Sequence, residues 1–280
     1  MLQRITVLLV LLIVGAADPA EPPPAAEPGA LIDQVLILTD ADARLNQVPA
    51  QLAAQLEARR AEMPPAAYTA ITAMVAEAFD PQALHETVRR SFEQAFDRDT
   101  LERAAAWLQS PLTRRMTALE REAMRPEAAT AMETWFAQAG QDAVPESRVA
   151  LLQRLIHATH ATDTSLRVVK TMMAGLANAV NVSMDQAPPS AEELGEAARE
   201  LEGSRAQIED RILARFLYTY REVSDEELTT YVAFWESDVG QWFNRVSSEA
   251  YAQAIERGAG QVTRGLAPAP ASPTGASRRP

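Results

Sequence analysis

Glycine and proline are scarce through the middle of this chain, where apolar residues recur with the 3.6-residue spacing of an amphipathic helix. Only five glycines lie between Leu31 and Arg257. Because glycine and proline are the residues that usually end helices, helices can run long between the few proline breaks. No segment shows the strict alternation of a half-buried strand. The chain is therefore predicted to be all-α.

The same periodicity, read with its proline and capping signals, divides the body of the chain into successive helices. A break is expected at Pro49, and Pro188–Pro189 separates two later helices. The predicted helices are Leu31–Val48, Ala50–Glu62, Ala66–Phe79, Gln82–Phe96, Thr100–Gln109, Leu112–Met124, Glu127–Ala139, Glu146–Ala161, Thr164–Met184, Ala191–Val223, Asp225–Glu236 and Val239–Arg257.

Charge and cysteine content exclude several classes of protein. The formal net charge is −12 and the sequence pI is about 4.8, so the chain repels phosphate backbones and anionic lipid surfaces. We therefore expect no nucleic-acid partner. There is no cysteine, which excludes disulfides, thiolate catalysis and cysteine-ligated zinc.

The first residues predict export. Met1–Ala17 resembles a secretory signal peptide, with Arg4 in its basic region, an apolar run over Ile5–Val14 and small residues before the expected cleavage point. The predicted location is periplasmic or secreted, and the alternative is an uncleaved N-terminal anchor. Because no later segment is apolar enough to span a bilayer, no membrane span is expected after leader removal. Pro-rich segments at 18–30 and 258–280 are predicted to be disordered.

A helix–serine–helix pattern occurs twice. Residues 96–124 align without gaps on residues 223–251. Every matched pair of residues is therefore separated along the chain by the same number of residues as Leu101 and Leu228. Ser110 and Glu122 recur as Ser237 and Glu249, and other apolar positions find similar partners. We therefore predict two tandem helical bundles, 31–140 and 141–257, joined through Gly140–Pro145. Each helix pair is expected to bury its apolar stripe against its own bundle.

The second copy carries a recognisable motif. Within Tyr218–Phe243 an acidic Glu-Glu-Leu start precedes Phe-Trp-Glu-Ser-Asp-Val-Gly at 234–240, and the first copy has Trp-Leu-Gln-Ser-Pro-Leu-Thr at 107–113. The segment resembles the bacterial exported family called domain of unknown function 2059, whose signature has Phe-Tyr-x-Ser-Pro-x-Gly here. The second copy lacks the proline and the first lacks the glycine. The resemblance implies a small helical bundle and supplies no catalytic residues.

Few residues suggest chemistry. His157, His160 and Asp163 are weak candidates for metal ligands, because two imidazoles at i and i+3 on a helix can face one ion. Asp163 could instead cap a helix starting at Thr164, and the remaining histidine, His85, lies on another predicted helix. No nucleophile elbow, phosphate-binding loop or zinc-protease motif occurs. No catalytic residue, cofactor-binding residue or cofactor is predicted.

The favoured interpretation is a non-catalytic binding or interaction module of the cell envelope. It predicts that an unidentified protein or apolar ligand binds an apolar groove between the copies, without a convergent polar site. One alternative is a metal-dependent or other hydrolase that uses His157 and His160. Another is a structural homo-oligomer with a self-complementary apolar face.

Overall fold

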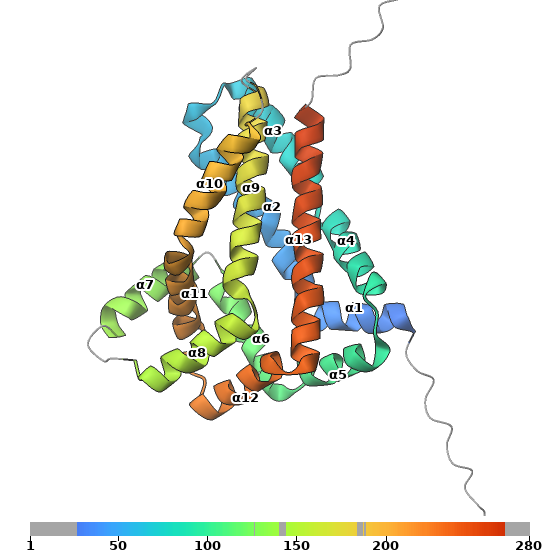
Figure 1. The fold of residues 1–280 in the computed structure, drawn as a ribbon, viewed down its shortest axis with the longest axis vertical. Coiled ribbons are helices and arrows are strands. Elements are labelled where there is room, and N and C mark those ends of the chain that lie inside the picture. Colours follow the sequence, from blue (N-terminus) through green and yellow to red (C-terminus); the bar gives the residue numbers. More distant parts are fainter. Residues whose placement is uncertain (1–26, 126, 140–143, 184–186, 188, 267–280) are drawn as a thin grey trace, which may run out of the picture.

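All regular structure in the described part of the chain is helical, as predicted (Figure 1). The computed structural model describes residues 27–125, 127–139, 144–183, 187 and 189–266. The predicted signal peptide, and most of the two Pro-rich segments and of the predicted joint, lie outside these residues. The helices are α1 (Pro28–Leu38), α2 (Ala41–Ala58), the 3-10 turn Arg60–Glu62, α3 (Pro65–Ala78), α4 (Pro81–Gln94), α5 (Arg98–Leu108), α6 (Pro111–Ala123), α7 (Ala128–Ala139), α8 (Glu146–Ala158), α9 (Ala161–Ser183), α10 (Ala191–Gly203), α11 (Arg205–Thr219), α12 (Asp225–Glu236) and α13 (Asp238–Leu266).

Helix starts follow the capping signals in the sequence. The side chains of Asp80, Asp97 and Ser110 each accept a backbone N–H from the first turn of the helix that follows. Ser190 with Glu193, and Ser224 with Glu227, form complete capping boxes. Each cap satisfies amide groups that have no partner within the helix, which contributes about 1 kcal/mol.

The first predicted break is wrong. Pro49 lies inside α2, and the chain turns instead at Asp40, whose φ of 56° is left-handed. Leu45, Leu52 and Leu56 on both sides of Pro49 are buried in one stripe. We attribute the continuity of α2 to this burial, which offsets the one backbone hydrogen bond that proline cannot make.

Two other boundaries also differ from the prediction. The single helix predicted over Ala191–Val223 is two helices, α10 and α11, that meet at Ser204. The predicted disordered segment 258–280 begins too early, because α13 continues to Leu266. A Cβ on Gly258 would lie only 2.6 Å from the Phe79 ring, so the glycine lets this part of α13 pack closely. The predicted linker 18–30 likewise overlaps α1, which begins at Pro28.

The helices before α7 and the helices after α7 contact one another in a similar pattern. In the first half α1 contacts α4 and α5, and in the second half α8 contacts α11 and α12. Likewise α2 contacts α3 and α4, whereas α9 contacts α10 and α11. Helices α5 and α12 begin at Arg98 and Asp225, and α6 and α13 begin at Pro111 and Asp238, so both pairs of starts have the offset of the sequence repeat.

The main apolar cores cross from one half to the other. Helix α13 runs beside α9 and also contacts α3, α4 and α5 (Figure 1). Its residues Phe243 and Val246 belong to the same buried cluster as Leu101 and Leu108 of α5. Conversely, Met116 of α6 is buried with Leu228 and Val232 of α12, among others. The expectation that each helix pair packs only against its own bundle is therefore wrong.

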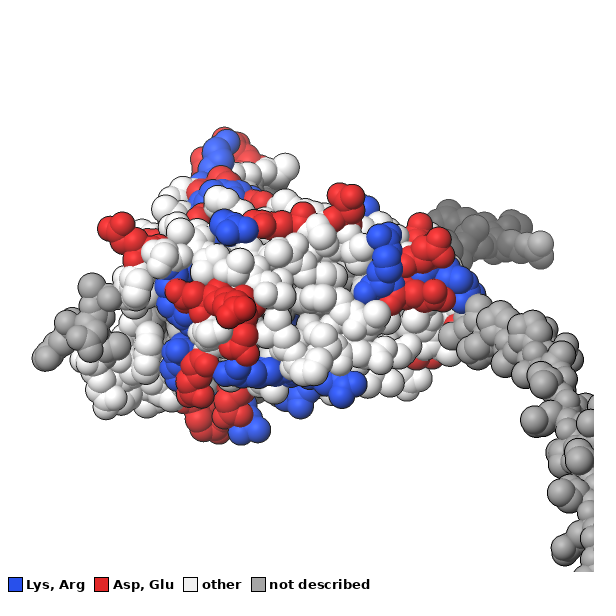
Figure 2. Space-filling view, turned by 90° about the horizontal axis from the view of Figure 1, so that it is seen from below, with Lys and Arg blue, Asp and Glu red and all other residues white. Residues whose placement is uncertain are grey.

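The surface seen in Figure 2 carries acidic and basic side chains in mixed clusters, separated by uncharged areas. Acidic and basic side chains of the described residues also pair across helices, for example Arg167 with Glu249 and Glu256 at 2.7 and 2.9 Å. Exposed pairs of this kind contribute little to stability individually. None of the described helices combines the length and apolar character needed to cross a bilayer.

Candidate functional site

A cavity of about 450 Å³ lies where the two halves of the chain meet. Its walls come from α1, α2, α4, α5 and α6 of the first half and from α8, α9, α11, α12 and α13 of the second. Most of the lining is apolar, and it includes Leu36, Phe92, Leu108, Leu155, Phe216, Trp235 and Phe243. A volume in this range suits a small organic ligand.

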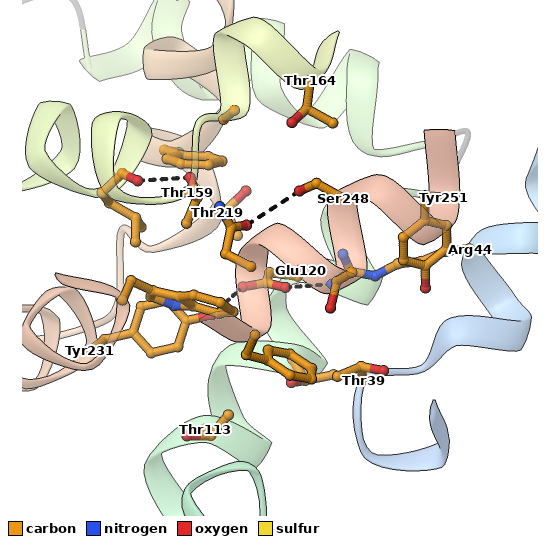
Figure 3. A pocket seen from close by; sticks show the side chains of 18 of the residues that line it. Thr39, Arg44, Thr113, Glu120, Thr159, Thr164, Thr219, Tyr231, Ser248 and Tyr251 are labelled. Carbon is orange, nitrogen blue, oxygen red and sulfur yellow. Dashed lines mark hydrogen bonds and ion pairs between the residues drawn. The ribbon is translucent and has the colours of Figure 1, made fainter. Parts of the chain in front are cut away.

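One carboxylate organises the polar part of the cavity. Glu120 of α6 lies between Arg44 and Tyr231 (Figure 3). Its Oε1 accepts hydrogen bonds from the hydroxyls of Tyr220 and Tyr231 at 2.8 and 2.7 Å. Its Oε2 accepts one from Arg44 Nη2 at 2.9 Å. The cluster joins α2 and α6 to α11 and α12, so it links the halves as well as lining the cavity.

Burial fixes the protonation of the two phenols. It raises the pKa of Tyr220 and Tyr231 well above 10, and the negative charge of Glu120 raises both further. Both tyrosines therefore stay neutral and donate to Glu120 at physiological pH. Burial opposes the charge of Arg44 most strongly, but Glu120 together with Tyr251, Tyr231 and Tyr220 outweighs it, so the pKa of Arg44 is raised.

One hydrogen-bond donor at the cavity wall has no acceptor. Arg44 Nε is buried without a partner in the described chain. Arg44 still keeps 40% of its side-chain surface accessible, and it lines the cavity. Arg215 adds a second cationic side chain to the lining. The wall thus offers N–H groups beyond those that Glu120 uses.

The two halves contribute unlike groups at matching positions. Glu120 and Ser247 are related by the offset of the repeat, as are Leu108 and Trp235, and all four line the cavity. Asp40 and His160 both have a left-handed backbone conformation. Arg44 lies four residues after Asp40, and Thr164 lies four residues after His160. Thr164 also lines the cavity. The charged groups of the first half therefore have small hydroxyl groups as their counterparts in the second.

A stack of aromatic rings supports the cavity wall. Trp107 of α5 and Phe234 of α12, which the repeat also matches, stack face to face with ring centroids 3.5 Å apart. Trp107 also meets Trp235 edge to face at 5.7 Å and lies 5.4 Å from Tyr231. These contacts hold Trp235 and Tyr231 in place at the cavity.

The structure does not bring the three weak metal candidates together, although His160 Nδ1 and Asp163 Oδ2 lie 4.0 Å apart. Helix α8 ends at Ala158, so His160 is not on the same helix as His157, and its φ is 49°. Asp163 lies in the first turn of α9 and accepts from Arg205 at 2.6 Å, whereas His157 faces Glu209 at 3.7 Å. His85 pairs with Asp42. No cluster of three or more metal-ligating side chains occurs among the described residues.

The sequence interpretation missed Arg44 and Glu120, although a signal for both was present. Each lies on the apolar stripe of its helix. Arg44 follows the buried Ala41 by three residues, and Glu120 follows the buried Met116 by four. A charge at such a position must be paired or must face a cavity, since an isolated buried charge is very costly. The favoured groove between the copies thus does contain convergent polar groups, contrary to the prediction.

Comparison with known proteins finds one family whose sequence model matches part of the chain. Residues 82–142 match the sequence model of a family described as "Uncharacterized protein conserved in bacteria (DUF2059)". The chain resembles DUF2059 in this segment. The DUF2059 segment includes Trp107–Thr113, so the predicted resemblance is confirmed for the first copy. The motif at 234–240 lies outside it. No curated protein and no solved structure matches the chain.

Proposed function

We propose that this chain is an exported, non-catalytic binding protein that holds a small, largely apolar ligand in the cavity between its halves. The observation that carries the proposal is the cavity of about 450 Å³, whose aromatic and aliphatic walls surround one fixed polar cluster. Binding sites for small molecules commonly combine a large apolar surface with a few polar groups that orient the ligand.

The state of the polar cluster favours binding over catalysis. A general base needs a free lone pair directed at its substrate. Glu120 instead accepts three hydrogen bonds, two at Oε1 and one at Oε2, so that one lone-pair site is left, on Oε2. Because burial keeps Tyr220 and Tyr231 protonated, neither supplies a phenolate nucleophile. The cluster therefore acts as a rigid polar wall.

Binding can be tested with the neutral apolar dye N-phenyl-1-naphthylamine, whose fluorescence rises in apolar surroundings. We expect saturable binding of one dye per chain. Ser247→Phe places a ring in the cavity and is expected to abolish this signal. Ser147→Phe, at an exposed position of α8, is the matched control and should bind normally.

Two results would overturn the proposal. One is the absence of saturable dye binding. The other is equal binding by the Ser247→Phe and wild-type proteins. If the dye fails to bind and the native mass is a multiple of the chain mass, the alternative of a structural homo-oligomer is favoured instead.

The residues at the start of the chain support the proposed export. Arg4 precedes the apolar run Ile5–Val14, and small residues follow it. Expression of the full chain in a bacterial host, followed by fractionation and N-terminal sequencing, tests the proposal. A periplasmic or secreted product that begins after Ala17 is expected. An unprocessed cytoplasmic product would contradict it, and an unprocessed membrane-bound product would indicate the uncleaved anchor.

A further inference from the structure

We infer that the ligand is an amphiphile with a single carboxylate head, which Arg44 binds at the polar wall of the cavity. This inference rests on the proposed function and names the ligand class for the same site. It follows from the balance of donors, acceptors and charges around the cavity.

Arg44 brings more hydrogen-bond donors to the polar wall than Glu120 accepts. Glu120 is its one carboxylate, and three donors already occupy it. Arg44 uses Nη2 for Glu120, while its Nε is buried with no acceptor. A guanidinium has five N–H donors in a planar fork, and its strongest partners are carboxylates and phosphates. Arg44 therefore complements a ligand group that accepts hydrogen bonds.

The formal charge of the lining selects a monoanion. Arg44 and the exposed Arg215 contribute two positive charges and Glu120 one negative charge, which leaves a formal charge of +1. One carboxylate would neutralise this excess. A dianionic phosphate monoester would leave an uncompensated negative charge in a largely apolar cavity, where unpaired charge is costly.

The asymmetry of the two halves predicts a single binding orientation. The first half contributes Arg44 and Glu120 to the lining, whereas the second contributes Thr164, Ser247 and one charged residue, the exposed Arg215. Hydroxyl groups bind an anion more weakly than a guanidinium does. The carboxylate is thus placed against α2 and α6, and the apolar chain extends along the aromatic and aliphatic wall that includes Phe92, Trp235 and Phe243.

The test compares the affinities of decanoate, decanol and decyl phosphate for the full chain by titration calorimetry. We expect decanoate to bind at least about tenfold more tightly than decanol, the gain from a charge-assisted hydrogen bond. Decyl phosphate is expected to bind more weakly than decanoate. Equal affinities for decanoate and decanol would overturn the inference, as would tighter binding of the phosphate.

Variants then locate the head group. Arg44→Gln should weaken decanoate binding by about tenfold and leave decanol binding unchanged, and Arg44→Lys should restore part of the loss. Arg90→Gln, an exposed arginine of α4, is the matched control and should change neither affinity. If Arg44→Gln fails to fold, the double variant Arg44→Gln/Glu120→Gln removes both charges and avoids an unpaired carboxylate.

The failure of the inference is distinguishable from the failure of the proposed function. If neither the neutral dye nor decanol binds, the cavity is not a binding site. If both bind, but neither the charge of the ligand nor the Arg44 substitutions change the affinity, only the assignment of the carboxylate head is wrong.

Discussion

Individual side chains in the cavity show how burial and charge together fix a polar site. Tyr220 and Tyr231 are buried in an apolar cluster, yet their hydroxyls both reach Glu120. A buried hydroxyl without a partner would be costly, so Glu120 makes the burial of the two rings possible. The same carboxylate holds Arg44, and the four side chains are therefore expected to act as a unit.

The raised pKa values of Tyr220 and Tyr231 predict a loss of stability at alkaline pH. Both lie well above 10 in the folded chain, whereas an unfolded tyrosine titrates near 10. Below pH 10 the two buried tyrosines make their full contribution to the free energy of unfolding. It is lost as the pH rises further, because the unfolded state releases protons that the folded state retains. We expect the free energy of unfolding to fall above pH 10.

Phenolate absorbance measures this effect directly. Of the five tyrosines, at least Tyr220 and Tyr231 should resist ionisation in the folded chain and titrate normally in denaturant. In the double variant Tyr220→Phe/Tyr231→Phe, the fall in stability above pH 10 should be smaller. Normal titration of all five tyrosines in the folded wild-type chain would contradict the account.

At the scale of helices, the sequence predicted starts better than breaks. Caps such as Ser110 and Ser224 are local signals, because the side chain bonds the backbone of its own first turn. The turn at Asp40 and the continuity through Pro49 depend instead on which apolar stripe is buried. That information is tertiary, and the periodicity of α2 alone does not contain it.

Gly240 illustrates a helix junction with no space for a side chain. A Cβ there would lie 2.0 Å from the carbonyl oxygen of Phe234 and 2.8 Å from Trp235 Cα. Since both are backbone atoms, they cannot move aside cheaply. Gly240→Ala is expected to lower the free energy of unfolding by about 3 kcal/mol or more. Chemical denaturation measures the change.

Gly195 in α10 is the matched control, because nothing lies within 4 Å of an added Cβ. Gly195→Ala should raise the free energy of unfolding by about 0.5–1 kcal/mol, the difference in helix propensity. A Gly240→Ala protein as stable as the wild type would show that the α12–α13 junction is looser than described.

Glycine substitutions at the two histidines near the α8–α9 junction are expected to change the free energy of unfolding in opposite directions. His160 is left-handed, a conformation that is costly for residues with a side chain. His160→Gly should therefore raise the free energy of unfolding by about 0.5–1 kcal/mol. His157 lies within α8, so His157→Gly should lower it by up to about 1 kcal/mol. Thermal denaturation of both variants tests the pair, and changes of the same sign would contradict the left-handed turn.

At the scale of the whole molecule, we propose that the two halves descend from a duplicated helical unit. The equal offsets of the α5/α12 and α6/α13 starts, the similar neighbours of the helices in the two halves, and the paired left-handed turns support the proposal. The stacked rings of Trp107 and Phe234 place matching positions of both halves in contact. The crossing of the cores could not be predicted from the sequence pattern, because an apolar stripe does not specify which surface covers it.

The crossed cores predict a single cooperative unfolding transition. Phe243 and Val246 of α13 complete the core of the first half, and Met116 of α6 belongs to that of the second. Neither half can therefore unfold without exposing part of the other's core. Far-ultraviolet circular dichroism and tryptophan fluorescence should give coincident transitions in denaturant. Two separated transitions would indicate independent domains.

The central claim is that a ligand occupies the cavity between the halves, and tryptophan quenching by a brominated decanoic acid tests it most directly. Trp235 lines the cavity, whereas Trp135 packs against Phe136 and Tyr218 away from it. We predict saturable quenching that is reduced in Trp235→Phe and retained in Trp135→Phe. Quenching that is absent, or that survives the Trp235→Phe substitution unchanged, would contradict the account.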